Sequence, residues 1–233
     1  MLDERLHFVR AMLTDLARLD AKREVFGASA HDYALREPLR DVEVVRFERR
    51  HGVKLPPDYR AFLTQLGDGG AGPFYGVFAL GKFEDDEPWK AGEFIGEPGT
   101  RFPYKAAWNA PMAVIDAVNA GDHAAEVAYH RGLDGIVPLV TEGCALFDVL
   151  VVTGPEAGHV WHDARTDLGG VVPWAEGKDA AKAHARTWSR DMLVTSGKRA
   201  KADVTPTPRA RLSFLEWYER WLMLAAASVS KKR

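Results

Sequence analysis

The chain has 233 residues, of which 46% are hydrophobic and 27% are charged, and its formal net charge at pH 7 is −2. These values are typical of a globular protein that is long enough to bury a substantial core. The nearly neutral balance argues against a protein that binds nucleic acid through its overall charge.

The chain has a single cysteine, Cys144. One cysteine excludes an internal disulfide and a cysteine-rich zinc site, and it is typical of a reducing compartment. The first residues carry scattered charges in place of the apolar core of a signal peptide. No apolar run approaches the roughly 20 residues needed to cross a bilayer. We therefore expect a cytoplasmic protein that does not enter a membrane.

Helices are predicted in the first seventy residues. Leucine and valine recur at steps of three and four over residues 2–19, which is the pattern of one buried helix face. A second helix is expected from about residue 41 to 51, with Gly52 after it as the stop. A third begins at the prolines 56–57, which favour a helix start, and ends at Gly67.

Short apolar runs bounded by glycine and proline then predict strands. The turn-forming residues 154–158 separate two of the runs, and the glycine-rich stretch 169–170 separates two more. Strands joined by such short turns are antiparallel. The predicted strands are 76–80, 136–140, 145–152, 159–163 and 171–174, and residues 81–111 are expected to be loops.

The last third of the chain combines two predicted helices with a basic segment. A helix is expected over 178–196, followed by a basic linker over 198–211. The last helix begins at Ser213, because Ser213 and Glu216 have the spacing of a capping box. Phe214, Trp217, Tyr218 and Trp221 form an aromatic stripe on this helix. The stripe is large enough to belong to the core.

Four segments, taken in this order, resemble the Smi/Knr branch of the SUKH superfamily. They are FERRHGVKLPPDYRAFLTQLGDGG (47–70), RFPYKAAWN (101–109), GIVPLVTEGCALFDVLVVTGPEAGHVWHD (135–163) and SFLEWYERWL (213–222). Similar proteins pass quickly from the last strand to the last helix, so the residues between them here lie outside the resemblance.

The resemblance implies an α+β fold in which helices pack on a bent antiparallel sheet. We expect an N-terminal helix (1–23), one SUKH-like domain (24–225) with a basic insertion (175–211), and a disordered tail (226–233). Several motif residues are expected to have structural roles: Leu55, Pro56, Asp58, Tyr59, Trp108, Gly154, Trp161, Trp217 and Trp221.

The resemblance also implies a role in protein binding. Bacterial members of the superfamily are mostly immunity proteins that bind a toxin domain, often a nuclease, and eukaryotic relatives are regulatory interaction proteins. The superfamily has no shared catalytic residues, so we expect no catalytic residue, no enzymatic activity and no cofactor.

The residues themselves indicate no catalytic or metal site. His159, His162, Asp163 and Asp167 have the right side chains for a metal site, but alternation along a strand points His159 and His162 to opposite faces, and likewise His162 and Asp163. The glycine-rich stretch 67–72 follows a helix and lacks a lysine, so a turn is a better interpretation than a phosphate cradle.

Cys144 has no positioned histidine in the sequence pattern, and a small buried residue is a better interpretation than a nucleophile.

Charge is uneven along the chain. Residues 51–150 carry seven basic and fourteen acidic residues, a balance of −7, whereas residues 178–211 carry nine basic and three acidic residues, a balance of +6. Such charges most often form solvated faces, but they can also form docking surfaces. The densest acidic run is Glu84, Asp85, Asp86 and Glu87.

Three hypotheses follow, and the last of them, an enzyme, ranks lowest because no convergent catalytic constellation appears in the sequence. The first is an immunity protein that covers the basic active face of a toxin, with the acidic run as its steering charges. The second is a regulatory scaffold whose basic segment 178–211 recruits an acidic partner. The sequence leaves open the identity of the partner, the position of the interface and the oligomeric state.

Overall fold

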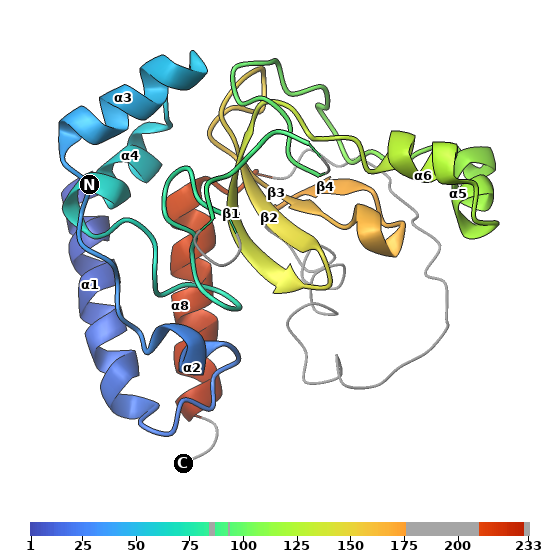
Figure 1. Cartoon of the computed structure of the whole chain (residues 1–233). Helices are drawn as coiled ribbons and strands as arrows, with labels where there is room; N and C mark the ends of the chain where they lie inside the picture. The colour runs from blue at the N-terminus through green and yellow to red at the C-terminus, as the bar shows by residue number, and fades with distance from the viewer. Residues whose placement is uncertain (84–86, 93, 176–209, 231–233) are drawn as a thin grey trace.

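The computed structural model describes residues 1–83, 87–92, 94–175 and 210–230 (Figure 1). Its helices are α1 (Leu2–Leu19), α2 (Ala28–His31), α3 (Asp41–His51), α4 (Pro57–Gln65), α5 (Met112–Asn119), α6 (His123–Tyr129) and α8 (Phe214–Ser230), with a 3-10 turn η2 (Arg165–Asp167). Its strands are β1 (Ile136–Gly143), β2 (Leu146–Val151), β3 (Val160–Asp163) and β4 (Val171–Pro173). The predicted α+β class is confirmed. No helix within these ranges is both long enough and apolar enough to cross a membrane.

The three helices predicted near the N-terminus are confirmed as α1, α3 and α4. Helix α1 buries Leu6, Val9, Leu13 and Leu16, which recur at steps of three and four. Helix α3 stops at Gly52, whose backbone φ of 66° favours a residue without a side chain. Helix α4 starts at Pro57, as proline in the first turn predicts.

The sheet has the strand order β1-β2-β3-β4, and every pair is antiparallel. Strand β1 shifts register between Pro138 and Val140 and again between Thr141 and Gly143, and such bulges bend a strand. Four of the five predicted strands are therefore confirmed, together with the turn at 154–158.

The predicted strand at 76–80 is wrong. Val77 pairs with Gly70 in an isolated bridge, and the amide of Phe78 donates to the carbonyl of Leu139 at 2.8 Å. Turns close on both sides, from Gly76 back to Pro73 and from Lys82 back to Ala79. The extended run is therefore too short to form a ladder, although its apolar residues are needed in the core.

Three short helices were not predicted. Helix α2 has four residues, and α5 and α6 have eight and seven, which is too short for a periodic pattern to stand out. Asp122 caps α6, because its carboxylate accepts from the amides of Ala124 and Ala125 at 2.9 and 3.1 Å. In Figure 1, α5 and α6 lie at the end of the molecule away from α1.

Helix α8 lies at the centre of the fold. It starts with the predicted capping box: the Ser213 amide donates to Glu216 Oε2 at 2.8 Å and the Glu216 amide points to Ser213 Oγ at 3.5 Å. It continues to Ser230, so the predicted disordered tail is wrong for residues 226–230. The reason is that Ala226 and Val229 pack against the core.

Packing on α8 brings distant parts of the chain together. Helix α1 contacts α8 along its length, and Arg5 donates two hydrogen bonds of 2.8 Å to the carboxylate of Glu219. Figure 1 shows α1, α3, α4 and α8 on one side of the sheet. Helix α1 thus shares the main core with the predicted domain, and the boundary at residues 23 and 24 stays a prediction.

The two faces of the sheet carry different hydrophobic clusters. The larger cluster lies between the sheet and the helices, and it includes Leu150, Val160 and Trp174. The smaller cluster includes Phe147, Val149, Val151, Trp161 and Val171, and it is closed by Ile95, Phe102 and Leu133. Because β2 alternates between these clusters, Asp148 faces the helices.

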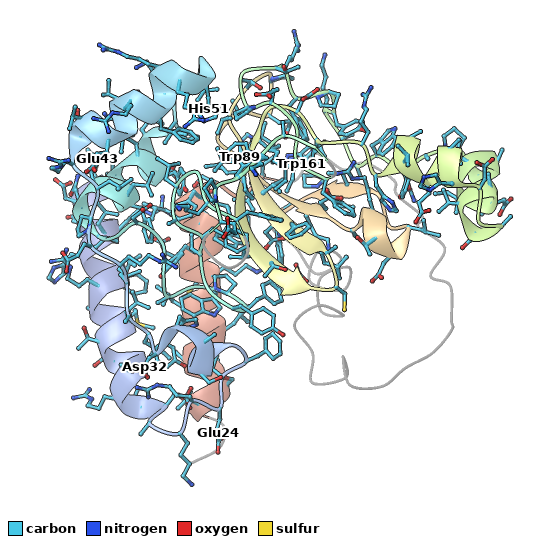
Figure 2. All side chains as sticks on the ribbon, viewed as in Figure 1. Glu24, Asp32, Glu43, His51, Trp89 and Trp161 are labelled. Atoms are coloured by element: carbon cyan, nitrogen blue, oxygen red, sulfur yellow. The ribbon has the colours of Figure 1, made fainter. Side chains whose placement is uncertain are left out.

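Aromatic stacking joins α3 to the segment that follows the acidic run. The imidazole of His51, at the end of α3, stacks on the indole of Trp89 with ring centroids 5.5 Å apart and planes 2° apart (Figure 2). Phe47 lies beside both rings. Helix α3 therefore uses Phe47 and His51 to hold the segment that contains Trp89.

The flanks of residues 176–209 pair with each other. Ala175 and Arg211 form an antiparallel bridge, and the amide of Leu212 donates to the carbonyl of Trp174 at 3.0 Å. Arg211 also forms an ion pair with Glu156 at 3.3 Å. The predicted linker therefore ends before residue 211, because Arg211 is held by the fold. The helix predicted at 178–196 lies outside the described residues.

Asp58 joins α4 to α8. Its Oδ2 accepts a hydrogen bond of 3.0 Å from the amide of Leu215, in the first turn of α8. A carboxylate at this position satisfies an amide that the helix leaves free and also opposes the positive end of the helix dipole. This contact explains why the LPPDY segment and the SFLEWY segment belong together.

Asp58→Ala should lower the free energy of unfolding by about 1–2 kcal/mol, as the loss of other helix caps does. Urea unfolding measures the change. Asp15→Ala is the control, because that aspartate makes an exposed pair with Arg18 and its loss should cost no more than about 0.5 kcal/mol. Equal stability of the two variants would contradict a role for Asp58 in holding α8.

Replacing residues 176–210 by a turn of about four residues should leave the fold intact, since hairpin loops of two to five residues join paired flanks. We expect a melting temperature within a few degrees of the full-length value. A longer deletion through Ser213 is the control, because it removes the buried Leu212 and the α8 cap, and it should destabilise the protein strongly. A large loss of stability in the shorter deletion would show that the insertion is part of the core.

Candidate functional site

A buried carboxylate lies at the junction of the sheet and α8. Asp148, on β2, is 0% exposed. Its Oδ1 accepts a hydrogen bond of 2.8 Å from the indole of Trp174, and its Oδ2 accepts one of 2.9 Å from the indole of Trp217. Buried charge is costly without such donors. Asp148 therefore depends on a residue that follows β4 and on a residue of α8.

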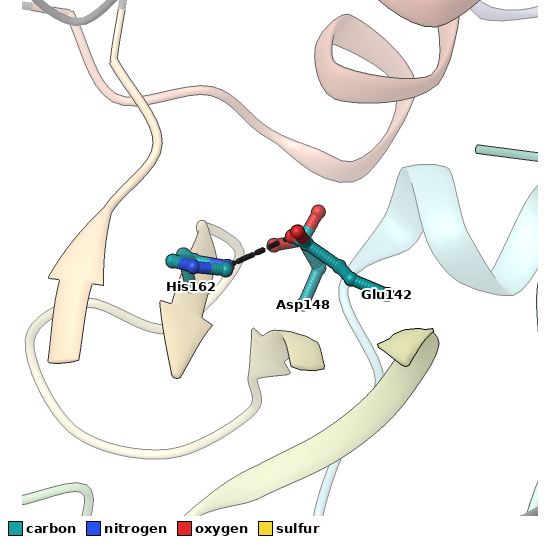
Figure 3. Close-up of side chains that lie close together, drawn as sticks. All are labelled: Glu142, Asp148 and His162. Carbon is teal, nitrogen blue, oxygen red and sulfur yellow. Dashed lines mark hydrogen bonds and ion pairs between the residues drawn. The ribbon is translucent and has the colours of Figure 1, made fainter. Parts of the chain in front are cut away.

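Two more ionisable side chains meet Asp148. His162 is its cross-strand partner on β3, and Nδ1 of His162 lies 3.1 Å from Asp148 Oδ1. The same nitrogen lies 2.9 Å from Glu142 Oε1, near the end of β1 (Figure 3). We call Glu142, Asp148 and His162 the polar cluster. Its members are 2%, 0% and 7% exposed.

Burial and mutual contact shift the pKa values in the polar cluster. Burial raises the pKa of Glu142 to about 7, although the nearby His162 opposes this shift. Burial alone lowers the pKa of His162, but hydrogen bonds and charge attraction from Asp148 and Glu142 outweigh it and raise this pKa to about 10. The cluster therefore favours proton uptake by both groups.

The polar cluster has the donor set of a cation site. One ligand-type atom from each of the three side chains lies within 4.8 Å of the others. Imidazole and carboxylate together suit divalent first-row metals. Because all three side chains are buried, a substrate would have to open the sheet to reach them. The cluster is thus better placed to hold a small ion or protons than to catalyse a reaction.

Of the four residues weighed as metal ligands in the sequence, His162 alone joins the cluster. His159 pairs with Glu156 at 3.6 Å. Asp163 forms a buried pair with Arg165 at 2.6 Å, and Asp167 lies in η2. The structure therefore separates these four residues, as the alternation along a strand predicts for neighbours of His162.

Glu142 and Asp148 were not predicted as partners of His162, because the candidate ligands in the sequence were taken from one strand and the turn after it. The partners of His162 come from two neighbouring strands, and Asp148 and His162 lie opposite each other in the β2–β3 hairpin. The turn at 154–158 fixes that register, so the hairpin pattern held a signal for this pair. No comparable signal placed Glu142, because a register shift precedes it in β1.

The motif residues from the resemblance lie mainly in the core. Leu55, Tyr59, Trp161, Trp217 and Trp221 are at most 5% exposed, and Pro56 is also buried. Trp108 is half-buried and stacks on Tyr104 with centroids 4.7 Å apart. Gly154 has a φ of 80°, and a side chain there would lie 3.3 Å from the carbonyl oxygen of Phe102.

Two other features of the sequence lie in turns. Cys144 is exposed, with a φ of 53°, in the turn between β1 and β2, so the expectation of a buried cysteine is wrong. A two-residue hairpin turn places its side chains in solvent. The glycine-rich stretch 67–72 follows α4, and the amide of Gly67 donates to the carbonyl of Phe62, as a helix stop does.

A surface groove lies beside the outer edge of β1. It has a volume of about 690 Å³, and we call it the β1-edge groove. Among the residues that line it are His31, Arg36, Tyr75, Phe83, Thr141 and Gly143. Tyr75 is 50% exposed and touches Phe26, which is 57% exposed, with centroids 5.6 Å apart.

The predicted acidic run lies partly outside the described residues, which exclude Glu84, Asp85 and Asp86. Its last member, Glu87, is exposed. The amide of Phe83 donates to the carbonyl of Glu87 at 2.9 Å, and Lys82 and Pro88 form a bridge. Phe83 and Glu87 are thus held close together, and Phe83 lines the β1-edge groove.

Residues 38–150 match the SMI1 / KNR4 family (SUKH-1). The match covers α3, α4, the α5–α6 pair, β1 and most of β2. It includes Glu142 and Asp148 but not His162 or α8. Comparisons with curated proteins and with solved structures gave no significant match.

The polar cluster should make stability depend on pH. Because the folded-state pKa of His162 is about 10, its contribution is fully present below the unfolded value of about 6.5 and is lost as pH rises towards 10. Glu142, raised to about 7, acts in the same direction between about pH 4.5 and 7.

Urea unfolding at about pH 6, 7.5 and 9, in a chelating buffer so that protons alone occupy the cluster, should show stability falling with pH. His162→Gln should reduce the loss of stability above about pH 7. Glu142→Gln should reduce the loss of stability below about pH 7. His123→Gln is the control, because His123 is exposed on α6. The same pH slope in wild type and both cluster variants would contradict these protonation states.

Proposed function

Because the chain carries a domain of the SMI1 / KNR4 family (SUKH-1), we propose that it binds another protein, as a bacterial immunity protein that neutralises a toxin domain encoded beside it. The observation that carries this proposal is the family match over residues 38–150. The role is the one that the resemblance implies for bacterial members of the superfamily. It requires occlusion of the toxin's active face and no reaction by this chain.

The β1-edge groove is the described surface best suited to such binding. Protein interfaces are enriched in aromatic side chains that become buried in the complex. Phe26 and Tyr75 are half exposed or more, and they touch each other beside the groove. Strand β1 is also the edge of the sheet. The amide of Phe78 covers this edge at Leu139, and the later residues Thr141 and Gly143 line the groove, where an incoming chain can meet the strand. We therefore assign Phe26 and Tyr75 as anchor residues.

The acidic run is the second part of the proposed interface. Phe83, which precedes the run, lines the groove, and its amide donates to the carbonyl of Glu87, the last member of the run. Four consecutive acids create a local negative potential, and the toxin we propose is a nuclease with a basic surface where it grips phosphate. Such a pair associates quickly through charge attraction. We therefore assign Glu84, Asp85, Asp86 and Glu87 as steering residues.

Co-expression tests the function directly. The product of the adjacent gene is expressed from an inducible promoter in a bacterial host, with or without this chain. We expect growth arrest without the chain, rescue with it, and a stoichiometric complex on purification. Failure to rescue and to form a complex would reject this pairing. Capture of an acidic partner that depends on residues 178–211 would instead favour the regulatory scaffold.

The two assigned surfaces should affect different rate constants. Phe26→Ala with Tyr75→Ala should raise the dissociation rate by about tenfold or more, since central anchors act on dissociation. Changing Glu84, Asp85, Asp86 and Glu87 to serine should slow association and flatten its dependence on salt, with little change in dissociation. Surface plasmon resonance with the toxin domain at several ionic strengths measures both.

The control for lost charge changes to serine four exposed acids that do not line the groove. They are Asp3, Asp15, Asp116 and Glu126. This variant has the same net charge as the acidic-run variant. If steering is specific to the acidic run, the control should slow association less. Equal association rates in the two variants would move the interface away from the acidic run, and an unchanged dissociation rate in the aromatic variant would remove the groove from it.

A further inference from the structure

The carboxylate of Glu142 lacks the hydrogen bonds that its burial demands. The residue is 2% exposed, and neither of its side-chain oxygens has a well-aligned hydrogen bond. Its Oε1 lies 2.9 Å from Nδ1 of His162, but that nitrogen also lies 3.1 Å from Asp148 Oδ1, so two carboxylates share one ring N–H. A buried carboxylate with so few directed donors is unfavourable.

Figure 3 shows the side chains of Glu142, Asp148 and His162 pointing toward one another. The distances between their oxygen and nitrogen atoms suit a metal ion. Bonds of about 2.1 Å that meet at 90–100° place neighbouring ligand atoms about 3.0–3.2 Å apart. The two contacts of His162 Nδ1 with carboxylate oxygens are 2.9 and 3.1 Å. Two carboxylates and a neutral imidazole carry a charge of −2, which one divalent cation neutralises.

We propose that Glu142, Asp148 and His162 form a closed binding site for one divalent transition-metal cation, with Zn²⁺ the best fit. The ligand atoms are Nδ1 of His162, Oδ1 of Asp148 and both oxygens of Glu142. Four ligand atoms from the protein give the coordination number that structural zinc sites use. The geometry is distorted from a tetrahedron, because two of these atoms belong to one carboxylate. The cation gives both Glu142 oxygens a directed partner.

The surrounding hydrogen bonds orient the ligands. The indoles of Trp174 and Trp217 donate to Asp148 at 2.8 and 2.9 Å. Partners of this kind fix a ligating carboxylate and strengthen metal binding. The cation therefore ties β1, β2 and β3 together beneath α8, and its role is to stabilise the fold. The proposal does not depend on the identity of the toxin.

The first experiment measures metal binding by the whole chain. Protein stripped with a chelator is titrated with ZnCl₂ against a chromophoric chelator, both in the native state and during refolding from urea, because a buried site fills slowly. We expect one zinc per chain and a melting temperature raised by several degrees. Co²⁺ should bind with the visible absorption of a four-coordinate ion and quench tryptophan fluorescence, since two indoles lie beside the site.

Glu142→Gln is the decisive variant. Glutamine has nearly the same shape and resembles the protonated carboxyl, so the metal-free variant should fold, which circular dichroism checks. We expect its zinc affinity to fall at least about 100-fold, because it loses a charged ligand. If the variant does not fold, the stoichiometry and the Co²⁺ spectrum of the wild type decide the question.

Two controls exclude ions held elsewhere. Glu156→Gln makes the same substitution in a glutamate that also lies beside a histidine, His159, at 3.6 Å. Cys144→Ser removes the exposed thiol two residues from Glu142. Both variants should bind zinc as the wild type does. Loss of binding in either control, with Glu142→Gln unaffected, would assign the ion to the surface and overturn the proposal.

Absence of stoichiometric zinc or cobalt binding, native or refolded, would also overturn it. The cluster would then hold protons in place of a metal, with Glu142 protonated and bonded to Asp148.

Discussion

The carboxylate of Asp148 is the interaction on which the arrangement of the domain depends. It is fully buried, and it accepts hydrogen bonds from the indoles of Trp174 and Trp217. One indole follows the last strand and the other belongs to α8, so a single charge fixes the helix against the sheet. Removing one partner of such a buried network leaves the others uncompensated, which costs about 3–5 kcal/mol. The two tryptophans therefore contribute geometry as well as buried area.

Helix α8 makes the fold non-local. It is the last element of the chain, yet its first turn is held by Asp58 of α4 and its flank by Arg5 of α1. The family match ends at residue 150, before β3, β4 and α8. The core that the matched segment begins is thus completed by residues outside it. The pairing of Ala175 with Arg211 allows this, because it returns the chain to the sheet after residues 176–209.

Polar or exposed aromatic side chains of interest gather at two separate places, the polar cluster and the β1-edge groove. The polar cluster lies beneath α8, where the indole of Trp217 donates to Asp148. The β1-edge groove lies on the surface and is lined by Tyr75, whose exposed ring touches that of Phe26. Strand β1 contributes to both, since Glu142 faces the cluster while its neighbours Thr141 and Gly143 line the groove. A cation that braces β1 would therefore also rigidify the edge that we assign to partner binding.

The sequence by itself determined the elements with strong local signals: α1 through its leucine spacing, α4 through its prolines, α8 through its capping box, and the hairpins through their turns. It also indicated the family through four short segments. Weak periodicity hid α5 and α6, and the apolar run at 76–80 resembled a strand although its neighbours turn too soon. The tertiary structure alone brought Glu142 to Asp148 and His162 and brought Asp58 to α8. These contacts join residues 6 to 157 positions apart, and they depend on strand register and helix packing, which local patterns along the chain do not encode.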